Sequence, residues 1–458
     1  MVESNSTNFI KNEEFKQLFN SFKNCYDGKN PIEVSFRKLV KDIPNSERAT
    51  HFIHPYPAKL LSHIPYFFLN NNIFSKPNDI VLDPFCGSGT VLLEAILAKR
   101  KAWGIDSNPL ARLIAKVKTT NLKISDIDEA EKRIINLYYT LNDDQCKTPD
   151  VININHWYEQ PTIKQLKKIL RCIDDISDEP LKSFFLISFS VCARKVSLAD
   201  PRITVPVKLK LKNNEIANNN ISKLLSNLTS VNVLQKFLEI VKNNKKRLTN
   251  LNVLTSEYNI ESKIIGDDCR FITSDLISKR KLEEETIDFI ITSPPYAGAQ
   301  KYIRASSLNI NWTKIAFPND LKILDGKTIG RENYQVKDFK DFKETSLEEA
   351  NSFLRDIFTV NRLRAHIAAN YLNEMEIVFS ELFRVLKKDK YMILVAANNL
   401  ICGKQFLTQK FLKDLAIKQG FEIVFELADD IHSYGLMTKR NKTASLITRE
   451  IVTIFKKK

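Results

Sequence analysis

Residues 83–90 decide the fold, and they read Asp83-Pro84-Phe85-Cys86-Gly87-Ser88-Gly89-Thr90. The apolar run Ile80-Val81-Leu82 precedes this stretch, and a second apolar segment, residues 91–97, follows it. The pattern predicts a buried strand, a glycine turn and a helix. Only eleven glycines occur in the chain, so two within one turn are informative. Glycine lets the backbone turn tightly and approach a ligand, so we expect a ligand at this end of the strand.

A second segment of this kind reads Thr292-Ser293-Pro294-Pro295-Tyr296 and follows the apolar run Phe289-Ile290-Ile291. Each proline fixes its φ angle near about −65°, which stiffens the loop. Polar acceptors on a stiff loop at the end of a strand are preorganised. The segment is therefore suited to hold a flat base by its exocyclic amine.

An acidic residue ends the next predicted strand, Ala102-Trp103-Gly104-Ile105-Asp106. An acid about 20 residues after a glycine turn binds two ribose hydroxyls in nucleotide-binding folds. The full dinucleotide pattern G-x-G-x-x-G is absent, so the glycine triplet that binds a pyrophosphate is missing. The sequence therefore favours S-adenosylmethionine (AdoMet) over NAD.

Short apolar strands that alternate with helices predict an α/β fold, a mostly parallel sheet flanked by helices. Further strands are expected near residues 263–267, 287–291, 391–395, 421–427 and 450–456. Between about 125 and 250 the apolar residues recur at helical spacing, which predicts a helical insertion. We divide the chain into a peripheral N-terminal segment (1–45), a cofactor-binding half of the core (46–125), the helical insertion (126–250), a catalytic half (251–300 and 371–458) and a second, irregular insertion (301–370).

The net charge of +15 and the pI near 9.2 favour a polyanionic partner. The polar N-terminus lacks the apolar region of a signal peptide. No apolar run approaches the roughly 18–20 residues that a membrane span needs. We expect a soluble, cytoplasmic protein without a membrane partner.

The seven cysteines include no C-x-x-C pair, so neither a zinc site nor a disulfide framework is expected. The six histidines lack metal-ligand spacing, and no metal site is predicted. For His51 and His54 an ordinary role in a loop or a cofactor lid is favoured. Cytosine C5 chemistry requires a cysteine nucleophile, typically after proline, and no Pro-Cys dipeptide occurs.

Taken together, these segments resemble the amino-group DNA methyltransferases. Residues 83–90 are similar to motif I, 104–109 to motif II, 266–268 to motif III and 54–59 to motif X. Ser293-Pro294-Pro295-Tyr296 is similar to the catalytic motif IV, in the form most often seen in N4-cytosine enzymes. Residues 384–387 and 440–444 also fit this family.

The resemblance implies an AdoMet-dependent methyltransferase (Rossmann-like) fold and assigns roles to individual residues. The implied catalytic residues are Ser293, Pro294, Pro295 and Tyr296. The implied cofactor-binding residues are Tyr56, Pro57, Lys59, Asp83, Pro84, Phe85, Cys86, Gly87, Gly89, Thr90, Asp106, Ser107, Asn108, Asp267 and Asp268.

The chemistry of Ser293-Pro294-Pro295-Tyr296 follows from the electronic structure of a nucleobase amine. Its lone pair is delocalised into the ring, so the nitrogen is a poor nucleophile. Acceptors such as Ser293 Oγ and the Pro294 carbonyl shift electron density back to nitrogen. Tyr296 offers an aromatic face to a base that has been flipped out of the duplex. The sulfonium is the leaving group, and in-line placement of nitrogen, carbon and sulfur completes the transfer.

We therefore expect a site-specific DNA methyltransferase that acts on N4 of cytosine in double-stranded DNA, with a companion restriction endonuclease. The alternatives are an adenine-N6 DNA methyltransferase, an RNA base methyltransferase and a catalytically silent DNA-binding protein. By analogy with the family, residues 126–250 are expected to read the target sequence, and 301–370 to form a wall of the DNA cleft. The basic run 242–247 is a candidate for phosphate contacts. Arg194-Lys195 and Asp200-Pro201-Arg202 are candidates to face a groove.

Overall fold

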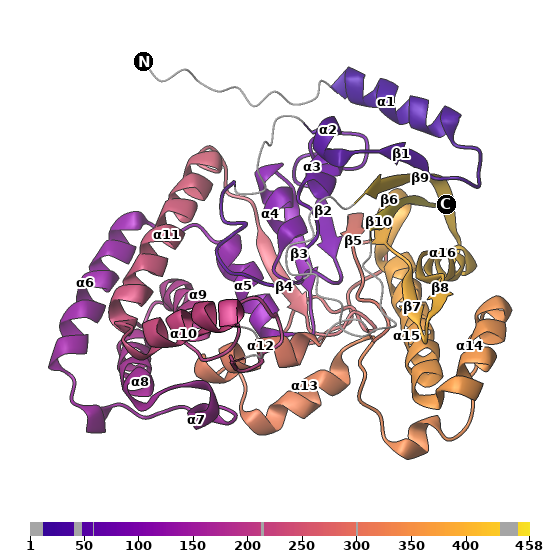
Figure 1. Ribbon diagram of the computed structural model, residues 1–458. Coiled ribbons are helices and arrows are strands. Elements are labelled where there is room, and N and C mark those ends of the chain that lie inside the picture. The colour runs from indigo at the N-terminus through magenta and orange to yellow at the C-terminus, as the bar shows by residue number, and fades with distance from the viewer. Residues whose placement is uncertain (1–11, 41–47, 58, 212–214, 299–300, 431–447) are drawn as a thin grey trace.

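The computed structural model describes residues 12–40, 48–57, 59–211, 215–298, 301–430 and 448–458 (Figure 1). Within them the main sheet has eight strands in the order β1-β9-β10-β6-β5-β2-β3-β4. These strands are β1 (Ile32–Val34), β2 (Ile80–Asp83), β3 (Lys101–Ile105), β4 (Ser262–Gly266), β5 (Ile287–Thr292), β6 (Leu386–Ala396), β9 (Phe421–Asp430) and β10 (Arg449–Lys457). The short strands β7 (Asn399–Ile401) and β8 (Lys404–Phe406) form a separate hairpin.

The sheet is mostly parallel, and the predicted α/β fold is confirmed. The pairs β1–β9, β2–β3, β2–β5, β3–β4 and β5–β6 are parallel. β10 alone among the described strands of this sheet runs antiparallel to its neighbours, β6 and β9. Strand β1 was not predicted, because three residues at a sheet edge give too short a pattern to recognise.

The chain changes direction across the sheet between β2 and β5. From β2 it proceeds outward through β3 to β4, and it then returns to place β5 on the other side of β2. Ligands of open α/β sheets bind at such a switch point, outside the carboxyl ends of the strands. The two segments that the sequence singled out, 83–90 and 292–296, follow these two adjacent strands.

Helices cover both faces of the sheet because successive strand residues point to opposite sides. Phe289 and Ile291 of β5 belong to one apolar cluster, and Ile290 belongs to the other. The first cluster includes residues of α1 (Asn12–Cys25), α2 (Phe36–Leu39), α3 (His63–Leu69), α4 (Thr90–Leu97) and α5 (Pro109–Lys118). The second includes residues of α14 (Glu348–Val360), α15 (Arg362–Val385) and α16 (Thr408–Lys418).

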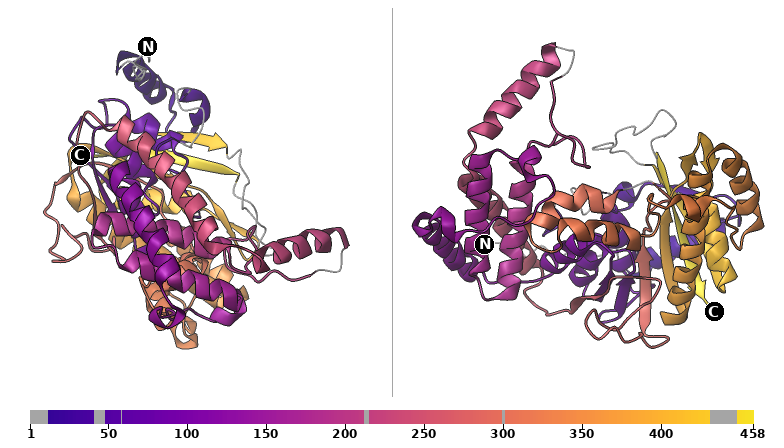
Figure 2. Two further views of the ribbon diagram at one scale, coloured as in Figure 1. Left: turned by 90° about the vertical axis from the view of Figure 1, so that its left-hand side faces the viewer. Right: turned by 90° about the horizontal axis from the view of Figure 1, so that it is seen from below.

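Helices occupy most of residues 124–254. They are α6 (Ile124–Thr140), α7 (Ile154–Trp157), α8 (Gln160–Asp174), α9 (Glu179–Lys195), α10 (Glu215–Thr229) and α11 (Val233–Leu254), with a short 3-10 turn at Asp143–Gln145. α9 is apolar around most of its circumference and packs against α5, α11 and α12 (Tyr302–Trp312). By contrast, α10 projects from the body of the molecule (Figure 2). Much of this helical segment therefore belongs to the core cluster of the first face.

Residues 301–370 are less irregular than the sequence suggested. They contain α12, α13 (Leu321–Lys327) and α14, together with 3-10 turns at Pro318–Asp320 and Val336–Phe339. The helix α15 runs without a break past residue 370, where the sequence analysis places a domain boundary. No helix in the described residues is long and apolar enough to cross a membrane.

The packing of α9 predicts that residues 126–250 unfold together with the sheet. Phe189 is fully buried, and its ring centroid lies 6.0 Å from that of Trp312 in α12. We expect Phe189→Ala to lower the free energy of unfolding by about 3–5 kcal/mol, because it leaves a cavity in the shared core. Chemical denaturation followed by circular dichroism is the measurement.

The matched control is Phe271→Ala, since Phe271 is 51% exposed and its loss is expected to change stability little. A single shifted transition is expected for Phe189→Ala. Two separate unfolding transitions, of which Phe189→Ala shifts only one, would contradict a shared core.

Candidate active site

A cavity lies where the motif segments meet at the switch point. Its lining comes from three separate parts of the chain: the segment before α3, the turn after β2 and the loop after β5. The lining residues are Tyr56, Lys59, Leu60, Asp83, Phe85, Cys86, Gly87, Ser88, Thr90 and Ser293. Eight of these were predicted from the sequence; Leu60 and Ser88 were not.

Asp83 joins the two central strands at the cavity. Its Oδ1 accepts hydrogen bonds from the Thr292 hydroxyl at 2.9 Å and from the Phe85 amide at 3.1 Å. Burial raises the pKa of this carboxyl from 3.8 to about 7, although both hydrogen bonds lower it. The site thus keeps a desolvated acid that a cationic ligand would help to ionise.

Asp106 is the second buried acid beside the glycine turn. Its Oδ2 accepts from the Gly87 amide at 2.9 Å, and its Oδ1 accepts from the Asn108 amide at 2.8 Å. Burial raises the pKa of Asp106, while these hydrogen bonds and Arg112 act in the opposite direction. Asn108 begins α5 and donates to the Tyr56 hydroxyl at 3.1 Å and to Ser306 Oγ at 3.2 Å. One amide side chain thus links motif II with motif X and with α12.

Glycine is required at two positions around this turn. Gly89 has φ +77°, and a Cβ atom there would lie 2.9 Å from Ala115 Cβ of α5. Gly104 of β3 lies under the turn, where a Cβ atom would lie 2.9 Å from Cys86 Sγ. Both contacts are closer than real Cβ atoms tolerate, so the turn, α5 and β3 depend on these glycines.

Motif X supplies Tyr56 and Lys59 to the cavity. The Lys59 ammonium donates to the carbonyls of His54 at 2.7 Å and His51 at 3.2 Å. Burial, aided by Arg247, lowers the pKa of Lys59 to about 8. The neighbouring histidines are structural: His51 Nε2 contacts Glu94, and His54 Nε2 lies 3.2 Å from Ser190 Oγ.

The two acids of motif III have different partners. Asp268 forms a bidentate ion pair with Arg270, whose other contacts include Glu374. Asp267 lies 3.6 Å from the Lys327 ammonium. Neither lines the cavity described above. Asp267, with the looser pairing, is the better placed of the two to exchange its partner for a ligand.

The loop after β5 is held from a segment that the sequence analysis did not single out. The Gly298 amide donates to the Gly330 carbonyl at 2.9 Å. A Cβ atom on Gly330, which has φ +77°, would lie 2.9 Å from the Tyr296 carbonyl oxygen. Glu332 pairs with Lys301 and Arg364 at the same place. The scarcity of glycine was the signal that could have identified Gly330.

Tyr296 itself is half-buried, and burial raises the pKa of its hydroxyl well above 10, so this tyrosine is neutral.

The remaining predicted residues do not line the cavity. They are Pro57, Pro84, Gly89, Asp106, Ser107, Asn108, Pro294, Pro295 and Tyr296. Residues 440–444 fall outside the described part of the chain. In that part no group of three or more potential metal ligands is present.

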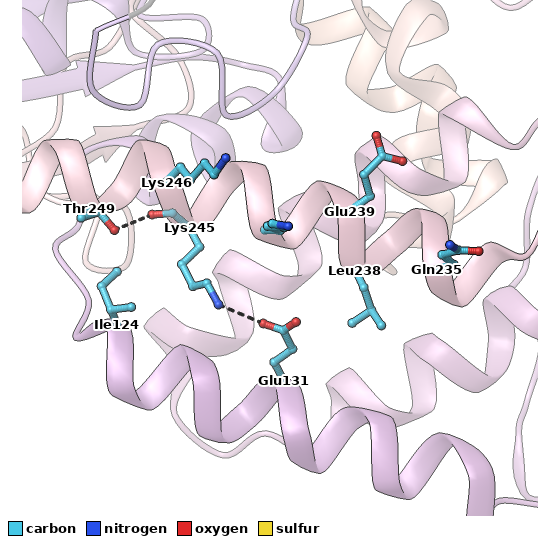
Figure 3. A pocket seen from close by; sticks show the side chains of 9 residues that line it. Ile124, Glu131, Gln235, Leu238, Glu239, Lys245, Lys246 and Thr249 are labelled. Atoms are coloured by element: carbon cyan, nitrogen blue, oxygen red, sulfur yellow. Dashed lines mark hydrogen bonds and ion pairs between the residues drawn. The ribbon is translucent and has the colours of Figure 1, made fainter.

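The basic run on α11 does not form one uniform cationic face. Figure 3 shows Lys245 reaching from α11 to Glu131 of α6, and Lys245 also pairs with Asp128 at 2.5 Å. Arg247 donates to Asn244 on the same helix. Arg194, near the end of α9, donates to the Ile203 carbonyl at 3.0 Å in the segment that follows the helix. These contacts engage Lys245, Arg247 and Arg194 within the protein.

Comparison with known proteins agrees with this geometry. A family model for DNA methylases that act on N6 or N4 amino groups matches residues 5–116. The chain is 25% identical over 437 residues to the Type II methyltransferase M.MvaI of Kocuria varians, covering 90% of this chain and 92% of that protein. It is 23% identical over 438 residues to the Type II methyltransferase M.BsoBI of Geobacillus stearothermophilus, covering 84% and 82%.

Among solved structures, a SAM-dependent methyltransferase from Methanosarcina mazei overlaps 84% of this chain and 94% of its own. The TM-score is 0.29 and the identity 10%. The sequence relatives and the family model, by contrast, agree with the motifs gathered at the switch point. Over most of its length the chain is therefore similar to Type II methyltransferases, and residues 5–116 match the family of amino-group DNA methylases, which includes both N6 and N4 enzymes. These similarities support an AdoMet-dependent amino-group methyltransferase of restriction-modification type.

Proposed function

We propose that this protein methylates N4 of cytosine in double-stranded DNA and protects the host from a companion restriction endonuclease. The observation that carries the proposal is the position of Ser293, which lies at the end of β5 and lines the same cavity as Asp83. The base-holding group and the cofactor-binding turn thus share one cavity. The S-P-P-Y form of the motif favours cytosine over adenine.

The residues around the cavity fit AdoMet. Gly87 lines it with φ +48°, and a Cβ atom there would lie 3.7 Å from the Tyr56 ring, where it would narrow the space for a ligand. Buried Asp83 offers a negative charge to a cationic amino acid, and Asp106 lies where ribose hydroxyls bind in related folds. When bound, AdoMet supplies an activated methyl group on a sulfonium.

The protein's own contribution is to orient the base amine. Ser293 Oγ and the Pro294 carbonyl accept its two hydrogens, which increases the electron density on nitrogen. Pro294 and Pro295 restrict the loop, and the contact of Gly330 with Tyr296 supports it from behind. Tyr296 is neutral and offers an aromatic face to the flipped base. The acceptors are therefore fixed before the substrate arrives.

The test is product analysis on unmethylated duplex DNA. The purified protein is incubated with DNA and AdoMet, the DNA is digested, and the nucleosides are separated by mass spectrometry. We expect N4-methylcytosine. N6-methyladenine would overturn the choice of base, and methylation of RNA alone would overturn the choice of nucleic acid.

Replacing Ser293 tests its role as an acceptor. We expect Ser293→Ala to lower kcat by about 100-fold or more, because one preorganised acceptor for the amine is lost. Binding of S-adenosylhomocysteine is expected to change by less than about threefold, because a small hydroxyl at the rim of the cavity contributes little to it.

Single-turnover kinetics and isothermal titration calorimetry measure the two effects of Ser293→Ala. The control is Ser125→Ala on the exposed surface of α6. If Ser293→Ala keeps its activity but binds S-adenosylhomocysteine weakly, Ser293 contacts the cofactor and not the base.

Ionisation of the Asp83 carboxyl is expected to lower the free energy of unfolding of the ligand-free protein as the pH rises. Its pKa is 3.8 in an unfolded chain and about 7 in the fold, so the folded state holds the proton more tightly. The stabilisation is complete below pH 3.8 and is lost as the pH rises through about 7, on the order of 4 kcal/mol. Asp83→Asn keeps the acceptor for Thr292 and removes this charge.

We therefore expect Asp83→Asn to raise the melting temperature more at pH 8 than at pH 5.5, and to abolish AdoMet binding. Thermal denaturation at both pH values is the measurement. An equal change at both pH values would show that Asp83 ionises normally in the fold.

A further inference from the structure

A fully buried lysine lies beneath the cofactor turn. Lys118 is the last residue of α5, and its exposed fraction is 0%. In the part of the chain that the structure describes, its ammonium makes one hydrogen bond, to Ser88 Oγ at 3.5 Å, and no ion pair. Lysine is almost never fully buried without a partner. Lys118 thus lacks the anion that such a position normally requires.

The acid near Lys118 is already engaged. Glu94 of α4 is buried, and its carboxylate binds both Arg48 and His51. Glu94 therefore has one charge for two basic partners, and its effect on Lys118 is small beside the cost of burial. The position of Lys118 next to Glu94 does not explain the buried charge.

A second lysine, Lys59, lies close to Lys118. Lys59 lines the cavity, as do Ser88 and Cys86, and both Lys59 and Cys86 lie close enough to Lys118 to affect its ionisation. The Lys59 ammonium is bonded to two carbonyl groups, which carry no full charge. Burial lowers the pKa of both lysines. Lys59 therefore acts on Lys118 beside Ser88 and Cys86, while the buried acid Asp83 lines the same cavity.

This distribution of charge matches an amino acid zwitterion. A cationic amine or sulfonium would be stabilised beside Asp83, and a carboxylate would be stabilised beside the two lysines. Of the groups that AdoMet carries, only the α-carboxylate of its methionine part is an anion. It would give Lys118 the partner that the protein itself does not provide.

We propose that Lys59, together with Lys118 acting through the Ser88 hydroxyl, stabilises the α-carboxylate of AdoMet and thereby selects cofactors that carry an intact amino acid. The inference rests on AdoMet as the cofactor and goes beyond the motifs, because Lys118 lies outside all of them. Ser88 relays the contact: its hydroxyl faces the ammonium and its residue lines the cavity.

The test compares two ligands that differ in this part of the molecule. S-adenosylhomocysteine carries the carboxylate, and 5′-methylthioadenosine lacks the whole amino acid. We expect Lys118→Met to weaken S-adenosylhomocysteine about tenfold or more, the loss of one charge-assisted contact. Its effect on 5′-methylthioadenosine is expected to stay within about twofold. Isothermal titration calorimetry on the full chain measures both.

The matched control is Lys116→Met, which removes an exposed lysine from the same helix and is expected to change neither affinity. Thermal denaturation gives a second readout. Removing a buried amine that has no ion-pair partner should leave the ligand-free protein equally stable or more stable, while the stabilisation by S-adenosylhomocysteine shrinks. A lysine needed only for the fold would give the opposite pattern.

Equal weakening of both ligands, or of neither, would overturn the proposal while leaving the enzyme's function intact. Failure of the unmodified protein to bind either ligand would overturn the cofactor assignment as well. If Lys118→Met does not fold, Lys118→Gln keeps the length and polarity of the side chain without its charge. A chain that folds with neither substitution would show that the charge serves the fold, which also overturns the proposal.

Discussion

The parallel pairing of β2 with β5 is the constraint on which the rest of the structure depends. It places the ends of two strands, more than 200 residues apart in sequence, side by side at the switch point. The hydrogen bond from Thr292 to Asp83 closes this junction, because a buried carboxylate needs donors wherever water is excluded. The cofactor turn and the base-binding loop thereby line one cavity.

The sequence singled out the segments of this centre because strong local signals coincide there. An apolar strand, scarce glycines and adjacent prolines restrict the backbone whatever surrounds them, so residues 80–97 and 287–296 could be interpreted directly. The parallel sheet followed from the alternation of strands and helices. The choice between N4 and N6 could not be derived as firmly, because both amines need the same acceptors.

What the sequence did not reveal depends on contacts between distant segments. Gly330 supports Tyr296 only because residues 328–332 return to the loop after β5, and nothing in the local pattern announces that return. Buried Lys118 ends an ordinary amphipathic helix, and its significance appears only when Ser88 and Lys59 are placed beside it. In each case burial in the folded chain, not residue type, carries the information.

The role of residues 126–250 also changes once their packing is known. Sequence recognition was expected of the whole insertion, but α9 is buried on nearly every side and α11 pairs with α6 through Lys245. The buried side chains of α9 cannot contact base edges without breaking the core, and Lys245 would have to leave its acidic partners to do so. We therefore infer that any reading of DNA by this segment falls to its exposed parts, of which α10 projects farthest (Figure 2). The buried helix α9 also contacts motif X, through the hydrogen bond between His54 and Ser190.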